Sequence, residues 1–114
     1  MYSKELVKGT LKPVILQLLQ EKGRMYGYEI AREIKIKSAE QMLVREGSLY
    51  PCLHSLAKDG LVETESEMVR GRTRKYYRLT QKGAAELPAL IHEIEAFITS
   101  LKSMFQLKST SYAI

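Results

Sequence analysis

The stretch EGSLYPCLHSLAKDGLVETESEMVRGRTRKYYRLT, Glu46–Thr80, contains the change of hydrophobic period that decides the fold. Its first part has leucines at intervals of four and three, which predict a helix with one buried face that ends near Gly60. From Leu61 the apolar residues alternate instead, in two runs separated by a turn in which Gly71 can adopt a positive φ. This second part predicts a two-stranded hairpin with a basic tip. The leucines of the helix are Leu49, Leu53 and Leu56.

The start of this helix depends on Pro51, which has no N–H to donate. If Ser48 is the N-cap, the proline lies in the first turn, where a missing donor costs little. If the helix begins at Glu46, the proline lies further inside and would distort it. The sequence leaves the start open between Glu46 and Ser48.

The positive charge of the chain is concentrated in the hairpin. Lys and Arg number 18 and Asp and Glu 13, for a net charge of +5 in 114 residues. Six of these bases and no acid lie between residues 70 and 82, so that the remaining bases and acids nearly cancel. Three glutamates of the first strand are expected to oppose Arg74 and Arg78 across the hairpin and to neutralise part of this charge. The bases are Arg70, Arg72, Arg74, Lys75, Arg78 and Lys82, and the glutamates are Glu63, Glu65 and Glu67.

Two helices are predicted before this segment. An apolar stripe that starts at Leu11 predicts the first, with Thr10 as its cap, and a shorter stripe predicts the second at about residues 27–35. A further short helix is possible at residues 3–8.

After the hairpin, Thr80 is expected to cap a long helix that runs towards Leu107. Its apolar residues follow alternating steps of four and three, which is the seam of a coiled coil, and a second row flanks them at intervals of seven. Such a face is too wide to pack on one small domain, and we expect it to pair with a second copy of the chain. Pro88 is expected to kink this helix or to divide off its first turns. The seam consists of Leu87, Ile91, Ile94, Ile98, Leu101 and Phe105, and the second row of Leu90, Phe97 and Met104.

Three helices, a hairpin and a long helix form the order of a winged helix-turn-helix protein, which is mainly α with a small β-hairpin. We expect residues 1–82 to form the DNA-binding domain, residues 83–108 the dimerisation helix, and residues 109–114 a frayed tail. In such a fold the helix before the wing enters the major groove and the basic hairpin lies along the DNA backbone.

Four segments resemble the PadR family of bacterial transcriptional regulators, in order and in spacing: LKPVILQLLQ, MYGYEIAREI, EGSLYPCLHSLAKDGLVE and RKYYRLTQKG. With one helix after the wing, the chain is similar to the short subgroup. The resemblance implies a homodimeric repressor, often released from DNA by a small aromatic or amphipathic compound. It also places the positions of Ser48 and Tyr50 at the DNA interface.

The candidate DNA contacts lie on the helix before the wing and on the wing itself. Tyr50, His54 and Lys58 are four residues apart, opposite the buried leucines, and suit base edges and phosphates. Arg70 and Arg72 flank Gly71 at the tip, where long cationic side chains reach phosphates or the minor groove. The complete set is Ser48, Tyr50, His54, Lys58, Arg70, Arg72, Lys75 and Tyr76. A solvated helix face and a merely solubilising loop are the alternatives.

The long helix is predicted to supply a dimer interface or an effector site. Some proteins that the chain resembles bind flat aromatic compounds between two such helices, where a tryptophan stacks on the ligand. This sequence contains no Trp, and a filled dimer core is favoured over a pocket. The residues concerned are Leu90, Ile94, Phe97, Ile98, Leu101, Met104 and Phe105.

Other classes of function find little support in the sequence. Cys52 is the single cysteine, and His54 and His92 lack metal-ligand spacing, so we expect neither a metal nor a cofactor. No nucleophile with a base, carboxylate pair or phosphate loop indicates an enzyme. We expect a cytoplasmic protein without a membrane span. The alternative function is a winged-helix module that binds protein without sequence-specific DNA binding.

Overall fold

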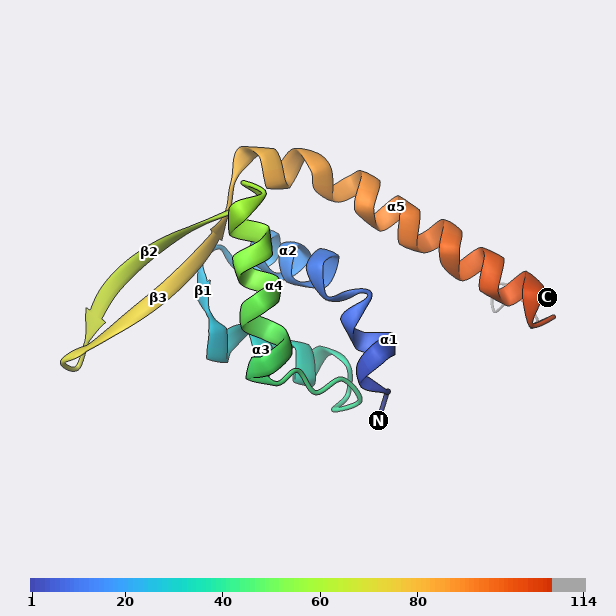
Figure 1. Cartoon of the computed structure of the whole chain (residues 1–114), viewed down its shortest axis with the longest axis horizontal. Coiled ribbons are helices and arrows are strands. Elements are labelled where there is room, and N and C mark those ends of the chain that lie inside the picture. Colours follow the sequence, from blue (N-terminus) through green and yellow to red (C-terminus); the bar gives the residue numbers. More distant parts are fainter. Residues whose placement is uncertain (108–114) are drawn as a thin grey trace.

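The computed structural model describes residues 1–107, which form five helices and a small sheet (Figure 1). The predicted fold class, mainly α with a wing, is confirmed, and the predicted tail at residues 109–114 lies outside the described residues. In chain order the elements are α1 (Lys4–Lys8), α2 (Leu11–Lys22), β1 (Met25–Tyr26), α3 (Gly27–Lys37), α4 (Glu46–Lys58), β2 (Val62–Val69), β3 (Arg72–Leu79) and α5 (Gln81–Met104).

The core lies where α2, α3 and α4 meet the base of the sheet and the first turns of α5. The leucine face predicted for α4 is confirmed, because all three of its leucines are buried. Burial of one such side chain contributes about 1.5–3 kcal/mol relative to exposure, so this face fixes the position of α4. The fully buried side chains include Leu11, Ile15, Leu16, Leu18, Leu19, Ile30, Leu53, Leu56 and Leu87.

Helix α4 begins at Glu46, the earlier of the two starts that the sequence left open. Pro51 therefore lies inside the helix and cannot donate to the carbonyl of Gly47. Gly47 is exposed, so water can bond to that carbonyl. At its other end α4 is followed by Gly60 with a φ of 76°, as the sequence predicted.

The sheet has three strands rather than the two of the predicted hairpin, in the order β1-β3-β2. The prediction missed β1 because two residues are too few to show a period. Met25 pairs with Tyr77 and Tyr26 with Tyr76, so that β1 joins the chain between α2 and α3 to the wing. We use the term wing for the hairpin Val62–Leu79.

The predicted ion pairs across the wing form only in part. Glu63 lies opposite Arg78 and Glu67 opposite Arg74 in the register. Arg78 nevertheless bonds to Glu65, with 3.0 Å between its Nη2 and a carboxylate oxygen. The expectation for Arg74 is wrong, because its guanidinium lies over the ring of Tyr26, 4.1 Å from the ring centroid.

The two predicted caps have different outcomes. Thr80 caps α5 by accepting a hydrogen bond from the N–H of Gly83 at 3.0 Å. Thr10 makes no side-chain cap for α2, because its hydroxyl donates instead to the carbonyl of Val7.

Helix α5 runs from Gln81 to Met104 without a break. Of the two effects expected of Pro88, a division of the helix is therefore wrong, and a kink stays a prediction. Leu87 packs in the core and Leu90 against it, and Ile94 still lines a groove with α1, α2 and α4, but the rest of the helix extends away from the other elements (Figure 1). Apart from the half-buried Leu101, the large apolar side chains of this later part are exposed, with Phe97 at 60% and Met104 at 68%. No helix among residues 1–107 is long and apolar enough to span a membrane.

Candidate nucleic-acid interface

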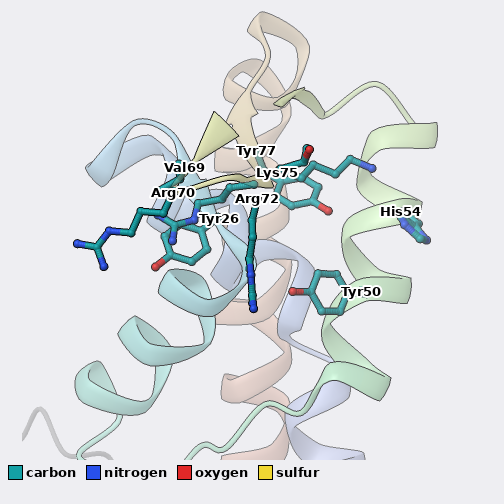
Figure 2. A pocket seen from close by; sticks show the side chains of 11 residues that line it. Tyr26, Tyr50, His54, Val69, Arg70, Arg72, Lys75 and Tyr77 are labelled. Carbon is teal, nitrogen blue, oxygen red and sulfur yellow. The ribbon is translucent and has the colours of Figure 1, made fainter. Parts of the chain in front are cut away.

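A groove of about 730 Å³ lies between α4 and the wing, with the start of α3 as its floor (Figure 2). Five of the eight predicted DNA contacts line it, two from α4 and three from the wing. Its lining consists of Tyr26, Gly27, Tyr50, His54, Val69, Arg70, Arg72, Thr73, Arg74, Lys75 and Tyr77.

Tyr50 projects from α4 across the floor of this groove towards α3. A Cβ atom added to Gly27 would lie 2.5 Å from the Tyr50 hydroxyl oxygen, so the ring reaches α3 only because residue 27 has no side chain. The ring is 37% exposed and keeps a hydrogen-bonding hydroxyl at the groove.

Tyr77 closes the inner side of the groove from β3. It is 2% exposed and belongs to the hydrophobic core. Burial raises its pKa above 10.0, because the phenolate would lose its solvation. Tyr77 therefore supports the groove as a neutral side chain.

His54 lies one turn after Tyr50 on the exposed side of α4 and also lines the groove, although its ring is turned away from the wing residues in Figure 2. Lys58 follows after another turn and is also exposed, but it lies outside the groove lining. The predicted face of α4 is thus accessible along its length, and its first two members line the groove.

The tip of the wing is a two-residue turn of Arg70 and Gly71, with φ values of 52° and 79°. Positive φ at both positions is typical of a type I′ turn, whose twist matches that of the strands. The strained member is Arg70, since a residue other than glycine rarely adopts this conformation. The turn places Arg70 and Arg72 at the mouth of the groove.

Three bases of the wing have neither an ion-pair partner nor an aromatic stacking partner among residues 1–107: Arg70, Arg72 and Lys75. The others have partners. Arg78 is paired with Glu65 and Arg74 is stacked on Tyr26. Lys82, which follows the wing at the start of α5, donates to the carbonyl of Asp59 at 2.8 Å. The three free bases of the wing therefore all line the groove.

Three predicted contacts lie elsewhere. Tyr76 is packed edge-on against Tyr26, with ring centroids 5.6 Å apart, and lies on the other face of β3. Ser48 lines a different groove, beside α5, and Lys58 lies at the far end of α4. The prediction in turn missed Tyr26 and Gly27, because only the pairing of β1 with β3 brings them under the wing.

A second groove, of about 610 Å³, lies between α1, α2, α4 and α5. Leu90 and Ile94 of the predicted effector or dimer residues line it, together with Ser48 and Cys52. Burial raises the pKa of the Cys52 thiol. The other five of those residues lie further along α5, and Leu101 is the only one of them that is half-buried: Phe97, Ile98, Leu101, Met104 and Phe105.

The shape and chemistry of the first groove suit double-stranded DNA. An exposed helix flanked by unpaired arginines can enter a major groove about 12 Å wide while the arginines contact phosphates on its edge. Hydroxyl and imidazole groups on the helix can then bond to base edges. Among residues 1–107 no group of three or more His, Cys, Asp or Glu side chains could hold a metal ion.

Residues 15–89 match the Transcriptional regulator PadR-like family. A protein of Lysinibacillus sphaericus is 36% identical over 94 residues, which cover 82% of this chain and 85% of that protein. The solved structure of a transcriptional regulator from Clostridium thermocellum has a TM-score of 0.81 at 30% identity, over 88% of this chain and 97% of that one.

A PadR-like transcriptional regulator from Bacillus cereus is similar as well, with a TM-score of 0.73 at 28% identity over 92% of this chain and all of that one. Since the family match covers more than half of the 114 residues, the chain belongs to the PadR-like family of transcriptional regulators, which bind DNA through a winged helix.

Proposed function

We propose that the chain is a homodimeric repressor that recognises a palindromic operator through the groove between α4 and the wing. The observation that carries this proposal is that Tyr50 and His54 of α4 and three unpaired bases of the wing line one groove. Helix α4 enters the major groove, and the wing follows the adjacent backbone.

Each side chain has a role that its chemistry allows. Tyr50 and His54 bond to base edges, and Lys58 contacts a phosphate one turn further along α4. Arg70 and Arg72 contact phosphates or enter the minor groove, and Lys75 contacts a phosphate on the groove side of the wing. Ser48 and Tyr76 lie outside this groove and are the weaker members of the predicted set.

The dimer is proposed to form through α5, in keeping with a division into a DNA-binding domain at residues 1–82 and a dimerisation helix at residues 83–108. Its support is the exposed apolar face of α5, on which Phe97, Ile98 and Phe105 are 60%, 45% and 64% exposed. Single exposed apolar residues are common, but a contiguous row along a helix marks an interaction surface. Two-fold pairing presents two α4 helices to two half-sites, which makes the operator a palindrome.

Release by a small aromatic compound is the last part of the proposal. The groove beside α5 contains Leu90 and Ile94, so a ligand there would contact both the dimerisation helix and α4. Such a ligand would shift operator affinity by the ratio of its affinities for the free and the DNA-bound chain. A thermal-shift screen of phenolic acids and planar cations, followed by DNA titration with each hit, tests this part.

Selection of duplexes from a randomised pool, followed by fluorescence anisotropy, tests the function as a whole. We expect enriched duplexes with two inverted half-sites about 34–36 Å apart, or one helical turn. The affinity for them should exceed that for random DNA by about 10³-fold or more and fall steeply with salt. Equal affinity for random duplexes, or affinity that does not change with salt, would favour a module that binds protein instead.

A further inference from the structure

Arg24 is the one residue outside the wing that forms ion pairs with it, among residues 1–107. Its Nη1 lies 3.4 Å from a carboxylate oxygen of Glu65, and its Nη2 bonds to Glu67. The same guanidinium lies over the ring of Tyr76, 3.9 Å from its centroid. One side chain thus contacts both strands of the wing.

The backbone on either side of Arg24 is tied to the core. Gly23, with a φ of 86°, ends α2 by donating to the carbonyl of Leu19. Met25, on the other side, is buried and pairs with Tyr77 of β3. Arg24 therefore links the wing to a short connection whose two neighbouring residues are both hydrogen-bonded to the core elements.

The outer part of the wing has little other support. All six residues from Glu63 to Met68 are exposed, and β1 pairs with β3 no further out than Tyr76. Beyond that register, the side chains that link the wing to the rest of the described chain are Arg24, which reaches Glu67, and Tyr26, on which Arg74 is stacked.

The position of the glutamates also needs an explanation. An acid on the wing of a DNA-binding protein weakens the attraction of that wing for phosphates. Glu65 and Glu67 lie on the face of the hairpin that carries Tyr76 and Arg74. Residues of both faces line the groove, among them Arg74 and Lys75, but neither glutamate does. The two acids are thus held by Arg24 and lie outside the groove lining.

We propose that Arg24 is a positioning residue for DNA binding: by holding Glu65, Glu67 and Tyr76, it fixes the angle of the wing and so keeps Arg70 and Arg72 at the mouth of the groove. Arg24 itself does not contact DNA in this account. The expected effect of Arg24 on DNA affinity rests on the proposed function. Its expected effect on the position and motion of the wing does not involve DNA.

The decisive variant is Glu65→Gln with Glu67→Gln in the full chain. Removal of two negative charges strengthens DNA binding if only overall charge matters. We call the contacts of Arg24 with Glu65, Glu67 and Tyr76 the clamp. If the clamp positions the wing, the same variant weakens binding to a duplex selected by the wild-type chain, by about tenfold. Glu63→Gln is the matched control, since Glu63 lies on the same face of β2 but forms no ion pair with any of residues 1–107.

Arg24→Lys is the second variant, because lysine keeps the charge but cannot reach two carboxylates with a fork of donors. We expect Arg24→Lys to lower the affinity for DNA as well. Added to the Glu65→Gln, Glu67→Gln chain, it should lower the affinity by less than it does in the wild-type chain, because residues that act together are not additive. Comparable melting temperatures for all variants would show that the fold is kept.

The readout without DNA is the ¹⁵N order parameter of the Val69 and Gly71 amides, which reports motion of the tip on the ps–ns timescale. We expect it to fall in the double glutamine variant and to stay unchanged in Glu63→Gln. Unchanged order parameters, or DNA binding as tight as wild type, would overturn the proposal. If the wild-type chain selects no duplex, the proposed function fails, and the order parameters still decide whether the clamp holds the wing.

Discussion

The hydroxyl oxygen of Tyr50 lies directly over Gly27, so close that a Cβ atom on residue 27 would be 2.5 Å from it. This contact joins the exposed face of α4 to the first residue of α3. It fixes the direction in which Tyr50 crosses the groove, and it explains why Gly27 stands at the start of a helix, where a residue with a side chain would otherwise be favoured.

Gly27→Ala should separate stability from DNA binding. Because the nearest atoms belong to the outer end of a partly exposed ring, Tyr50 can turn away, and alanine is the better helix former, so the free energy of unfolding should change by less than about 1 kcal/mol. The new position of Tyr50 should weaken operator binding by about tenfold in anisotropy titrations.

Gly47→Ala is the matched control for this variant, since a Cβ atom at Gly47 meets nothing within 4 Å. It should bind the operator as wild type does. If the Gly27→Ala chain also binds the operator as tightly as wild type, operator binding does not depend on the direction in which Tyr50 crosses the groove.

Gly83→Ala should act on stability instead. A Cβ atom there would overlap the carbonyl oxygen of Leu61 and lie 2.8 Å from Cδ1 of Leu79, and backbone cannot move as a side chain can. Overpacking of this kind costs roughly 1–3 kcal/mol or more, measurable by urea denaturation. Gly9→Ala, whose nearest contact is at 4.0 Å, should be close to neutral. A Gly83→Ala chain of wild-type stability would mean that α5 does not start as described.

Ile98→Asp should abolish dimers and leave the fold intact. Ile98 lies on the exposed seam of α5, at 45% exposure, where a charge would be buried between two copies. Ala96→Asp places the same charge two residues away, on the opposite face. Sedimentation velocity should show monomers for Ile98→Asp and dimers for wild type and Ala96→Asp. Dimers in all three would rule out this face as the interface.

The pKa of Tyr77, raised by burial above 10.0, predicts a loss of stability in alkali. The folded chain holds the phenolic proton more tightly than the unfolded chain, so this contribution is complete below pH 10 and disappears as the pH rises through the higher folded pKa. Absorbance titration of phenolate should show one late step that Tyr77→Phe removes. A Tyr77→Phe titration that keeps the late step would assign it to another tyrosine.

The sequence predicted those elements whose residues repeat often enough to show a period. The spacing of Leu49, Leu53 and Leu56 predicted α4, and the alternation of apolar residues after Leu61 predicted the wing. Both patterns arise because one face of each element is buried. The long seam from Leu87 to Phe105 likewise predicted α5, although a proline lies in it. Whether that seam is covered by a second copy stays a prediction.

Contacts between segments that are distant in the sequence were not predictable in this way. The two residues of β1 have no period, yet they bring Tyr26 under Arg74 and Arg24 against Glu67. From the sequence, Arg74 was expected to pair with a glutamate across the hairpin. In the structure its guanidinium is stacked on the ring of Tyr26 instead. The sequence therefore located the basic wing, and the structure identified which of its bases remain free.

The central claim, that the groove between α4 and the wing binds DNA, is tested most directly by Arg70→Ala with Arg72→Ala. Anisotropy titrations of a selected duplex at several salt concentrations should be compared with wild type and with Lys35→Ala and Lys102→Ala, which remove as much charge away from the groove. We predict that the wing variant loses about tenfold or more in affinity and that its salt slope falls by about two, one for each lost phosphate contact. An unchanged affinity and slope, or an equal loss in the control, would contradict the account.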